Sequence, residues 1–198
     1  MQTKNLIKTT IFKLLEEYSA DDLSVKMLCL ESGISKQTLY NHYYSIMDVI
    51  EEAYKEHCIE VVGEQGSYHN WAEVFRTMLT TLAENRNVTL HLYYSSHRDE
   101  FMNMINKCVS EFAGRAIEEC SADTRVEVSE KDKQFMLDFY MYVVMGIVDS
   151  FLGSRMKDDP DYLVSRSEAV MRHHIRKTLR NMYLIEHDEH RKIANTRV

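Results

Sequence analysis

The chain has 198 residues, of which 44% are hydrophobic, and a formal net charge of -7. This composition excludes a disordered chain, because enough apolar side chains are present to form a core. Six glycines and one proline are too few for the many turns of a β-sandwich or barrel. We therefore expect an all-α fold.

The N-terminus, "MQTKNLIKTT", has no long apolar run and no small-residue cleavage site, so no signal peptide is predicted. The most apolar run, residues 139–148, is shorter than the roughly 20 residues of a membrane-spanning helix. The four cysteines lack metal-site spacing and are expected to be reduced thiols. These features predict a cytoplasmic protein without membrane association.

The first helix is predicted over residues 5–19, where apolar side chains recur at steps of three and four. Ser24 is the predicted N-cap of a second, short helix that ends at Gly33. Ser35 caps a third helix that runs to about residue 43. Ser45 then caps a fourth helix, with Asp48 completing a capping-box-like pair.

Residues 24–44 therefore form a predicted helix-turn-helix, although the same geometry is also a common way to pack three helices. No acidic residue occurs between Gly33 and Ser45. Leu39 is expected to point inward. The side chains left outside can hydrogen-bond to base edges and phosphates, and they are Lys36, Gln37, Thr38, Tyr40 and Asn41.

Residues 24–49, "SVKMLCLESGISKQTLYNHYYSIMDV", resemble the DNA-binding signature of TetR-type bacterial regulators. The part "GISKQTLYNHY" carries most of the specificity. Two positions depart from that signature, because Ile46 stands where the family usually has a phosphate-binding lysine and Cys29 where it has alanine. The resemblance implies a recognition helix in the major groove, with DNA contacts from Ser24, Lys26, Ser35, Lys36, Gln37, Thr38, Tyr40, Asn41, His42 and Tyr44.

The resemblance also implies a homodimer that binds a palindromic operator in double-stranded DNA, most simply as a repressor. A small-molecule effector in the second domain would lower the DNA affinity. We expect a DNA-binding domain over residues 1–45 and a helical ligand-binding and dimerisation domain over 46–198. No enzyme activity and no cofactor are expected, since GxSxG, phosphate-loop and HExxH motifs are absent from the sequence.

The second domain is predicted to contain helices over 46–65, 70–86, 88–95, 97–121, 131–155 and 161–186. The helix over 131–155 is apolar nearly all round, so it must be covered on every side. A partner subunit is the simplest cover for the side that the core leaves open. The predicted dimer interface consists of Val144, Ile147, Phe151, Met171, Ile175, Leu179 and Met182.

The resemblance further implies an effector pocket between these helices, although each of its residues is also compatible with ordinary core packing. The residues expected to line it are Trp71, Met78, Leu82, His91, Tyr94, Phe101, Met104, Cys108, Tyr140 and Val144.

Two other interpretations remain open. Ile46 and the balance of five lysines and five acidic residues within 1–45 also suit a regulator-like adaptor that has lost DNA binding and acts through a protein partner. The spacing of "HDEH", residues 187–190, could supply two metal ligands, but no third ligand is near in sequence, and no metal site is predicted.

Overall fold

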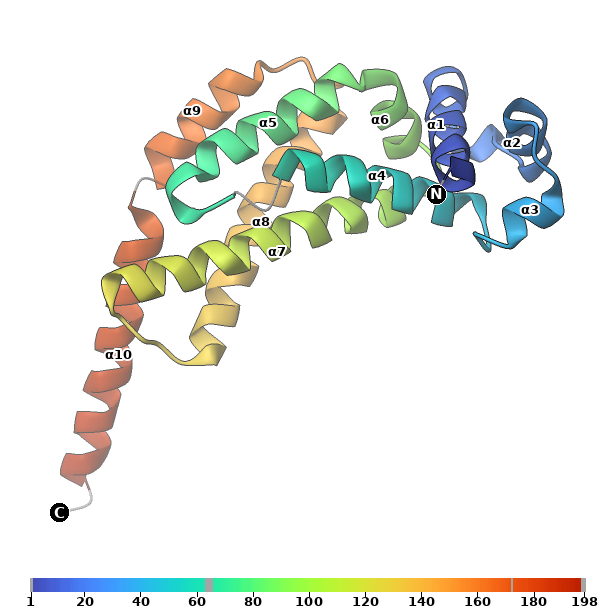
Figure 1. Cartoon of the computed structure of the whole chain (residues 1–198). Helices are drawn as coiled ribbons and strands as arrows, with labels where there is room; N and C mark the ends of the chain where they lie inside the picture. The colour runs from blue at the N-terminus through green and yellow to red at the C-terminus, as the bar shows by residue number, and fades with distance from the viewer. Residues whose placement is uncertain (1, 63–65, 172, 197–198) are drawn as a thin grey trace.

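The computed structural model describes residues 2–62, 66–171 and 173–196, and this part of the chain is all-helical, as predicted (Figure 1). At the N-terminal end lie α1 (Gln2–Glu17), a 3₁₀ turn η1 (Ala20–Asp22), α2 (Val25–Ser32) and α3 (Lys36–Tyr40). The remaining elements are α4 (Ile46–Val62), η2 (Tyr68–Asn70), α5 (Trp71–Glu84), α6 (Arg86–Tyr93), α7 (Arg98–Thr124), α8 (Glu130–Gly153), α9 (Pro160–Met171) and α10 (His174–Thr196).

The helix-turn-helix forms for the reasons that the sequence suggests. On α1, Ile7, Ile11 and Leu14 recur at steps of four and three and are buried. Gly33 ends α2 in the left-handed conformation, at φ 68°. Leu39 is the buried side chain of the short α3, which fixes the side of α3 that faces outward.

α4 connects the helix-turn-helix to the rest of the molecule. It packs against α1 at the N-terminal end, and against α5 and α7 in the body. One apolar core runs from Ile7 on α1 to Val164 on α9. The domain boundary predicted at residue 45 falls just before α4, and the core is continuous across it.

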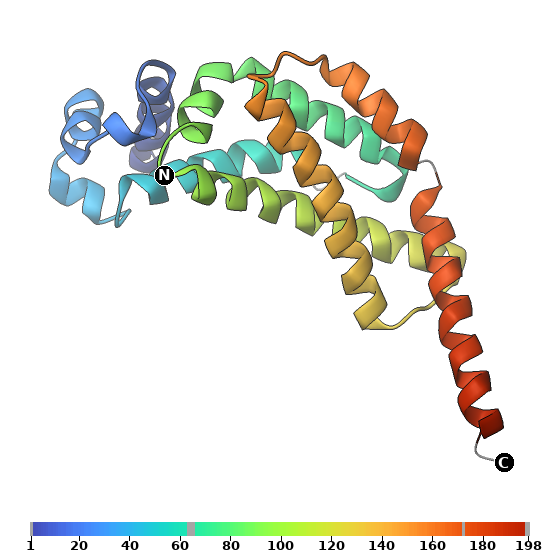
Figure 2. The same ribbon diagram turned by 180° about the vertical axis from the view of Figure 1, so that it is seen from behind.

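The C-terminal end differs from the prediction, because the single helix expected over 161–186 is two helices. α9 ends at Met171 and α10 begins at His174. His173 has a positive φ of 60°, which is incompatible with a continuous α-helix. α10 extends away from the body, at the end of the molecule opposite α3 (Figures 1 and 2).

α8 is the one helix in the described ranges that is long and apolar enough to cross a membrane by length and composition alone. The core helices of soluble proteins can pass the same test. Only 33% of the most apolar 18-residue window of α8 is buried in the protomer. In Figure 2, α8 lies in front of α7 and no other helix covers its outer side.

Candidate functional site

α3 presents a polar, solvent-exposed face at the tip of the molecule (Figure 1). Lys36, Gln37 and Tyr40 are exposed, whereas Leu39 anchors the opposite side. The Nε2 group of Gln37 donates to Oδ1 of Asn41 at 3.1 Å, so the two side-chain amides lie next to each other on this face. This face offers both donors and acceptors, which is what reading base edges requires.

Serine side chains fix where these helices start. Ser24 Oγ accepts from the backbone N–H of Met27 at 3.2 Å, and Ser35 Oγ accepts from that of Thr38 at 3.0 Å. Ser45 and Asp48 bond reciprocally through side chains and backbone N–H groups, at 3.1 and 3.0 Å. The caps predicted at these three serines are confirmed, and they stabilise the first turns of α2, α3 and α4.

The ten residues predicted to contact DNA are all exposed or partly exposed. Of the two tyrosines among them, Tyr44 is 94% exposed and Tyr40 51% exposed. Tyr43, in contrast, is buried, and burial raises the pKa of its phenol to about 12, so it stays neutral. Tyr43 packs in the core just after α3 and helps to hold the end of that helix in place. The contact of the ten predicted residues with DNA stays a prediction.

Ion pairs engage some of the five lysines of residues 1–45 and leave others unpaired, so the zero net charge of this segment does not describe its local charge. Lys4 pairs with Glu52 at 2.9 Å, Lys13 pairs with Glu31 at 2.5 Å, and Lys8 pairs with Glu56. Within the described ranges, the two remaining lysines of this segment, Lys26 and Lys36, make no ion pair. They lie within the helix-turn-helix, on α2 and at the first residue of α3, and are exposed, so their charges remain available to an anionic partner.

A second feature is an apolar cavity of about 100 Å³ in the body of the molecule. α5, α7, α8 and α9 surround it, and the α9–α10 junction contributes His173 and Ile175. Four of the predicted effector-binding residues line it, namely Trp71, Met78, Tyr140 and Val144.

The other six predicted effector-binding residues lie outside this cavity. Leu82, Phe101 and Met104 are buried core residues, and Cys108 is partly buried. His91 Nδ1 lies 2.7 Å from the backbone carbonyl of Leu15 on α1. Tyr94 is half-exposed and donates its hydroxyl to the carbonyl of Gly153 at 3.1 Å.

The seven residues predicted for the dimer interface pack within the protomer. Val144, Ile147, Met171 and Ile175 line the cavity, Phe151 and Leu179 are buried, and Met182 packs against a second apolar cluster. The large apolar side chains that α8 leaves exposed are Phe135, Phe139, Tyr142 and Val143. A helix that is apolar on all sides does not reveal from its sequence which side faces the core.

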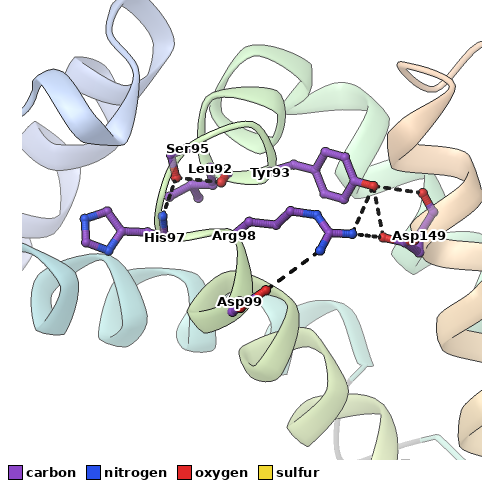
Figure 3. A network of polar contacts seen from close by, with 7 residues as sticks. All are labelled: Leu92, Tyr93, Ser95, His97, Arg98, Asp99 and Asp149. Carbon is purple, nitrogen blue, oxygen red and sulfur yellow. Dashed lines mark hydrogen bonds and ion pairs between the residues drawn. The ribbon is translucent and has the colours of Figure 1, made fainter.

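A polar network at the corner between α6 and α7 was not predicted from the sequence (Figure 3). The Tyr93 hydroxyl donates to Asp149 Oδ1 on α8 at 2.9 Å, and Arg98 Nη2 donates to the same oxygen at 2.5 Å. Arg98 also lies over the Tyr93 ring, at 4.7 Å from its centre. Burial raises the pKa of Tyr93, so this hydroxyl is a donor at neutral pH.

The same corner also contacts the N-terminal end of the molecule. Ser96 donates from its backbone N–H and from its hydroxyl to Asp21 in η1. His91 on α6 meets α1 as described above. Residues 91–98 thus contact α1 and η1 on one side and α8 on the other. The only sequence signal was Asp149, a carboxylate at the edge of an apolar run.

A helix-turn-helix with an acid-free outer face, joined by one helix to an all-helical body with an apolar cavity, is the architecture of a transcriptional regulator. A family model described as the C-terminal region of transcriptional regulators matches residues 69–173, which is more than half of the chain. The chain belongs to the TetR-type transcriptional regulators.

The solved structure of the dihydroxyacetone kinase operon activator DhaS has the same fold. The TM-score is 0.63 at 15% sequence identity, over 92% of this chain and 97% of that chain. Among curated protein sequences, none matches this chain.

Proposed function

We propose that this regulator binds a palindromic operator in double-stranded DNA as a homodimer, with α3 of each copy in the major groove. The observation that carries the proposal is the charge arrangement around α3. Three of the five lysines in 1–45 are paired with glutamates, whereas Lys26 and Lys36, next to the acid-free face, are unpaired within the described ranges. Gln37, Tyr40 and Asn41 supply the groups that read bases.

The dimer is proposed to form through the outer side of α8. Phe135, Phe139, Tyr142 and Val143 are exposed there, at helical spacing that places them on one stripe. Gly146 continues the stripe, and a Cβ built on it would meet nothing within 4 Å. A helix from a second copy can therefore approach α8 closely at this glycine and cover the stripe.

The cavity is proposed as the effector site, through which a small molecule lowers the DNA affinity. Linkage then requires that DNA weakens the binding of the effector by the same factor. We further propose that the protein acts in the cytoplasm and has no enzyme activity, as the regulator family and fold suggest. The resemblance of the helix-turn-helix favours repression, whereas DhaS is named an activator. A promoter-fusion reporter, measured with and without the protein, distinguishes repression from activation.

The experiment that tests DNA binding is a salt titration with DNA taken from upstream of the protein's own gene. Gln37→Ala should weaken binding to the cognate site by about 1–3 kcal/mol and relax one base position. Lys26→Ala should weaken binding to all sequences and reduce the salt slope by about one. Lys157→Ala, which removes the same charge from the exposed α8–α9 loop, is the matched control and should change neither.

The adaptor interpretation keeps one specific observation in its favour. Ile46, where the family usually has a lysine, is partly buried and packs against the core, so it offers no charge to a phosphate. The adaptor reading predicts that the protein binds upstream DNA no more tightly than unrelated DNA. In that case Tyr40→Ala should bind both DNAs as the wild type does, although Tyr40 lies on the face assigned to base contacts.

A further inference from the structure

We propose that the cavity accepts an uncharged molecule with one ring and one hydroxyl, of about seven to ten non-hydrogen atoms. This inference rests on the proposal that the cavity is the effector site and adds the chemical class of the effector. Three observations carry it, namely the charges missing from the lining, the volume, and the position of the polar atoms.

The lining excludes a charged ligand. Among the described residues that line the cavity there is no aspartate, glutamate, lysine or arginine, and one histidine, His173. Burial raises the pKa of the Tyr68 and Tyr140 phenols, so both are neutral donors and acceptors. An ammonium or carboxylate group would lose its hydration here without gaining a counter-charge, which is strongly unfavourable.

The charge-free lining is specific to this cavity. A second hollow, at the junction of α7 and α8, is bordered by charged side chains, including Arg125, Glu127 and Lys133. The molecule thus separates a charged hollow from a neutral one.

The volume limits the size of the ligand. One water molecule needs about 10–15 Å³ of free cavity volume. The cavity of about 100 Å³ therefore has room for roughly seven to ten water-sized groups. Aromatic rings surround this space, among them Trp71, Phe75 and Phe112. Rings of this kind favour another ring, stacked or edge-on.

The polar atoms of the lining suit a single hydroxyl. Ser167 donates its hydrogen to the carbonyl of Leu163 at 2.8 Å. The Tyr140 hydroxyl donates to Thr178 Oγ1 at 3.4 Å and lies 3.0 Å from His174 Nδ1. The oxygens of Ser167 and Tyr140 therefore retain acceptor capacity, and a ligand hydroxyl can donate its hydrogen to either of them.

The test uses isosteric probes and a reporter that the chain already contains. Trp71 is the only tryptophan of the sequence and lines the cavity, so its fluorescence reports occupancy. The probes are 4-methylbenzyl alcohol and 4-methylbenzylamine, which differ in a hydroxyl against an ammonium group, with 4-methylbenzoate as the anionic counterpart. We expect a Kd of about 1 mM for the alcohol, as for a fragment of this size, and binding at least about tenfold weaker for both ions.

Variants locate the binding and test the hydroxyl contact. Val144→Phe fills the cavity and should abolish binding of the alcohol. Val170→Phe adds the same atoms at a position of α9 that is 78% exposed and should leave it unchanged. Tyr140→Phe should weaken the alcohol about threefold to tenfold, yet leave 4-ethyltoluene, which has no hydroxyl, unaffected. Circular dichroism confirms that each variant is folded.

The outcomes separate this inference from the proposed function. Equal or tighter binding of either ion, or no binding of the alcohol by the folded wild-type protein, would overturn the inference even if DNA binding is normal. Binding of the alcohol as expected, combined with an unchanged DNA affinity at saturation, would leave the inference in place and overturn effector control through this cavity by this class of molecule.

Discussion

The carboxylate of Asp21 is bound twice by Ser96, which donates its backbone N–H at 3.0 Å and its hydroxyl at 2.6 Å. This pair joins η1, beside the helix-turn-helix, to the α6–α7 corner. The bonds stabilise the ionised carboxylate, and they lower the pKa of Asp21 from its ordinary value of 3.8, with the Ser96 hydroxyl as the main cause.

The first prediction follows from the sign of that shift. A carboxylate whose pKa is lower in the folded state stabilises the protein above its ordinary pKa, and this stabilisation disappears as the pH falls through the lowered value. Asp21→Asn should therefore lower the melting temperature at pH 7, and its difference from the wild type should shrink below pH 3.8. Asp22→Asn, at the exposed neighbouring position, is the control. An equal effect of both substitutions would contradict the assigned role of Ser96.

Gly33 provides a prediction about the turn between α2 and α3. Its φ is 68°, and a Cβ at this position would meet nothing within 4 Å. Gly33→Ala should therefore cost only backbone energy, about 1 kcal/mol of unfolding free energy, and Gly33→Asn should cost less. Urea titration measures both.

Gly114→Ala is the control with the opposite sign. Gly114 lies within α7, where a Cβ again meets nothing within 4 Å. The substitution should stabilise the protein by about 0.5–1 kcal/mol, because alanine is the better helix former. A Gly33→Ala variant as stable as the wild type would show that the left-handed turn does not determine the choice of glycine.

Ile46 gives a signed prediction about DNA affinity. Ile46→Lys restores a positive charge at the first residue of α4, so it should tighten DNA binding and steepen the salt slope by about one. Some stability should be lost, since Ile46 is partly buried against the core. Val170→Lys adds the same charge on α9 and should leave DNA binding unchanged. If both variants bind alike, position 46 lies away from the phosphates.

The dimer is tested on the exposed stripe of α8. Phe139→Lys and Tyr142→Lys place a charge where 49% and 80% of the native side chain is exposed in the protomer. Each should yield helical monomers in sedimentation velocity, because a buried unpaired charge opposes association. Gln134→Lys adds the same charge to another side of α8 and should remain dimeric. Dimers in both stripe variants would place the interface elsewhere.

The sequence was most informative where structure depends on near neighbours. The caps at Ser24, Ser35 and Ser45 and the turn at Gly33 involve residues only a few positions apart, and all four were foreseen. The outward face of α3 followed from the single buried anchor Leu39.

Features that depend on distant residues were not foreseen. In the network of Tyr93, Arg98 and Asp149, the aspartate is more than 50 positions from the other two residues. No local sequence pattern predicts such a contact. The break between α9 and α10 occurs at His173, which takes a left-handed conformation without a glycine or proline to mark it. On α8, apolar residues on every side left it undetermined which side faces the core. The residues predicted for the interface line the cavity or pack against the core within the protomer, and their contact with a second copy stays a prediction.

The limited burial of α8 bears on how the stability of the protein depends on its concentration. With the stripe covered by a second copy, folding and association are linked, and the stability of the protein rises with its concentration by mass action. At high dilution the helix returns to water with its apolar side uncovered. The contact that we propose across α8 therefore has to be tight enough for the dimer to persist at the concentration at which the protein works.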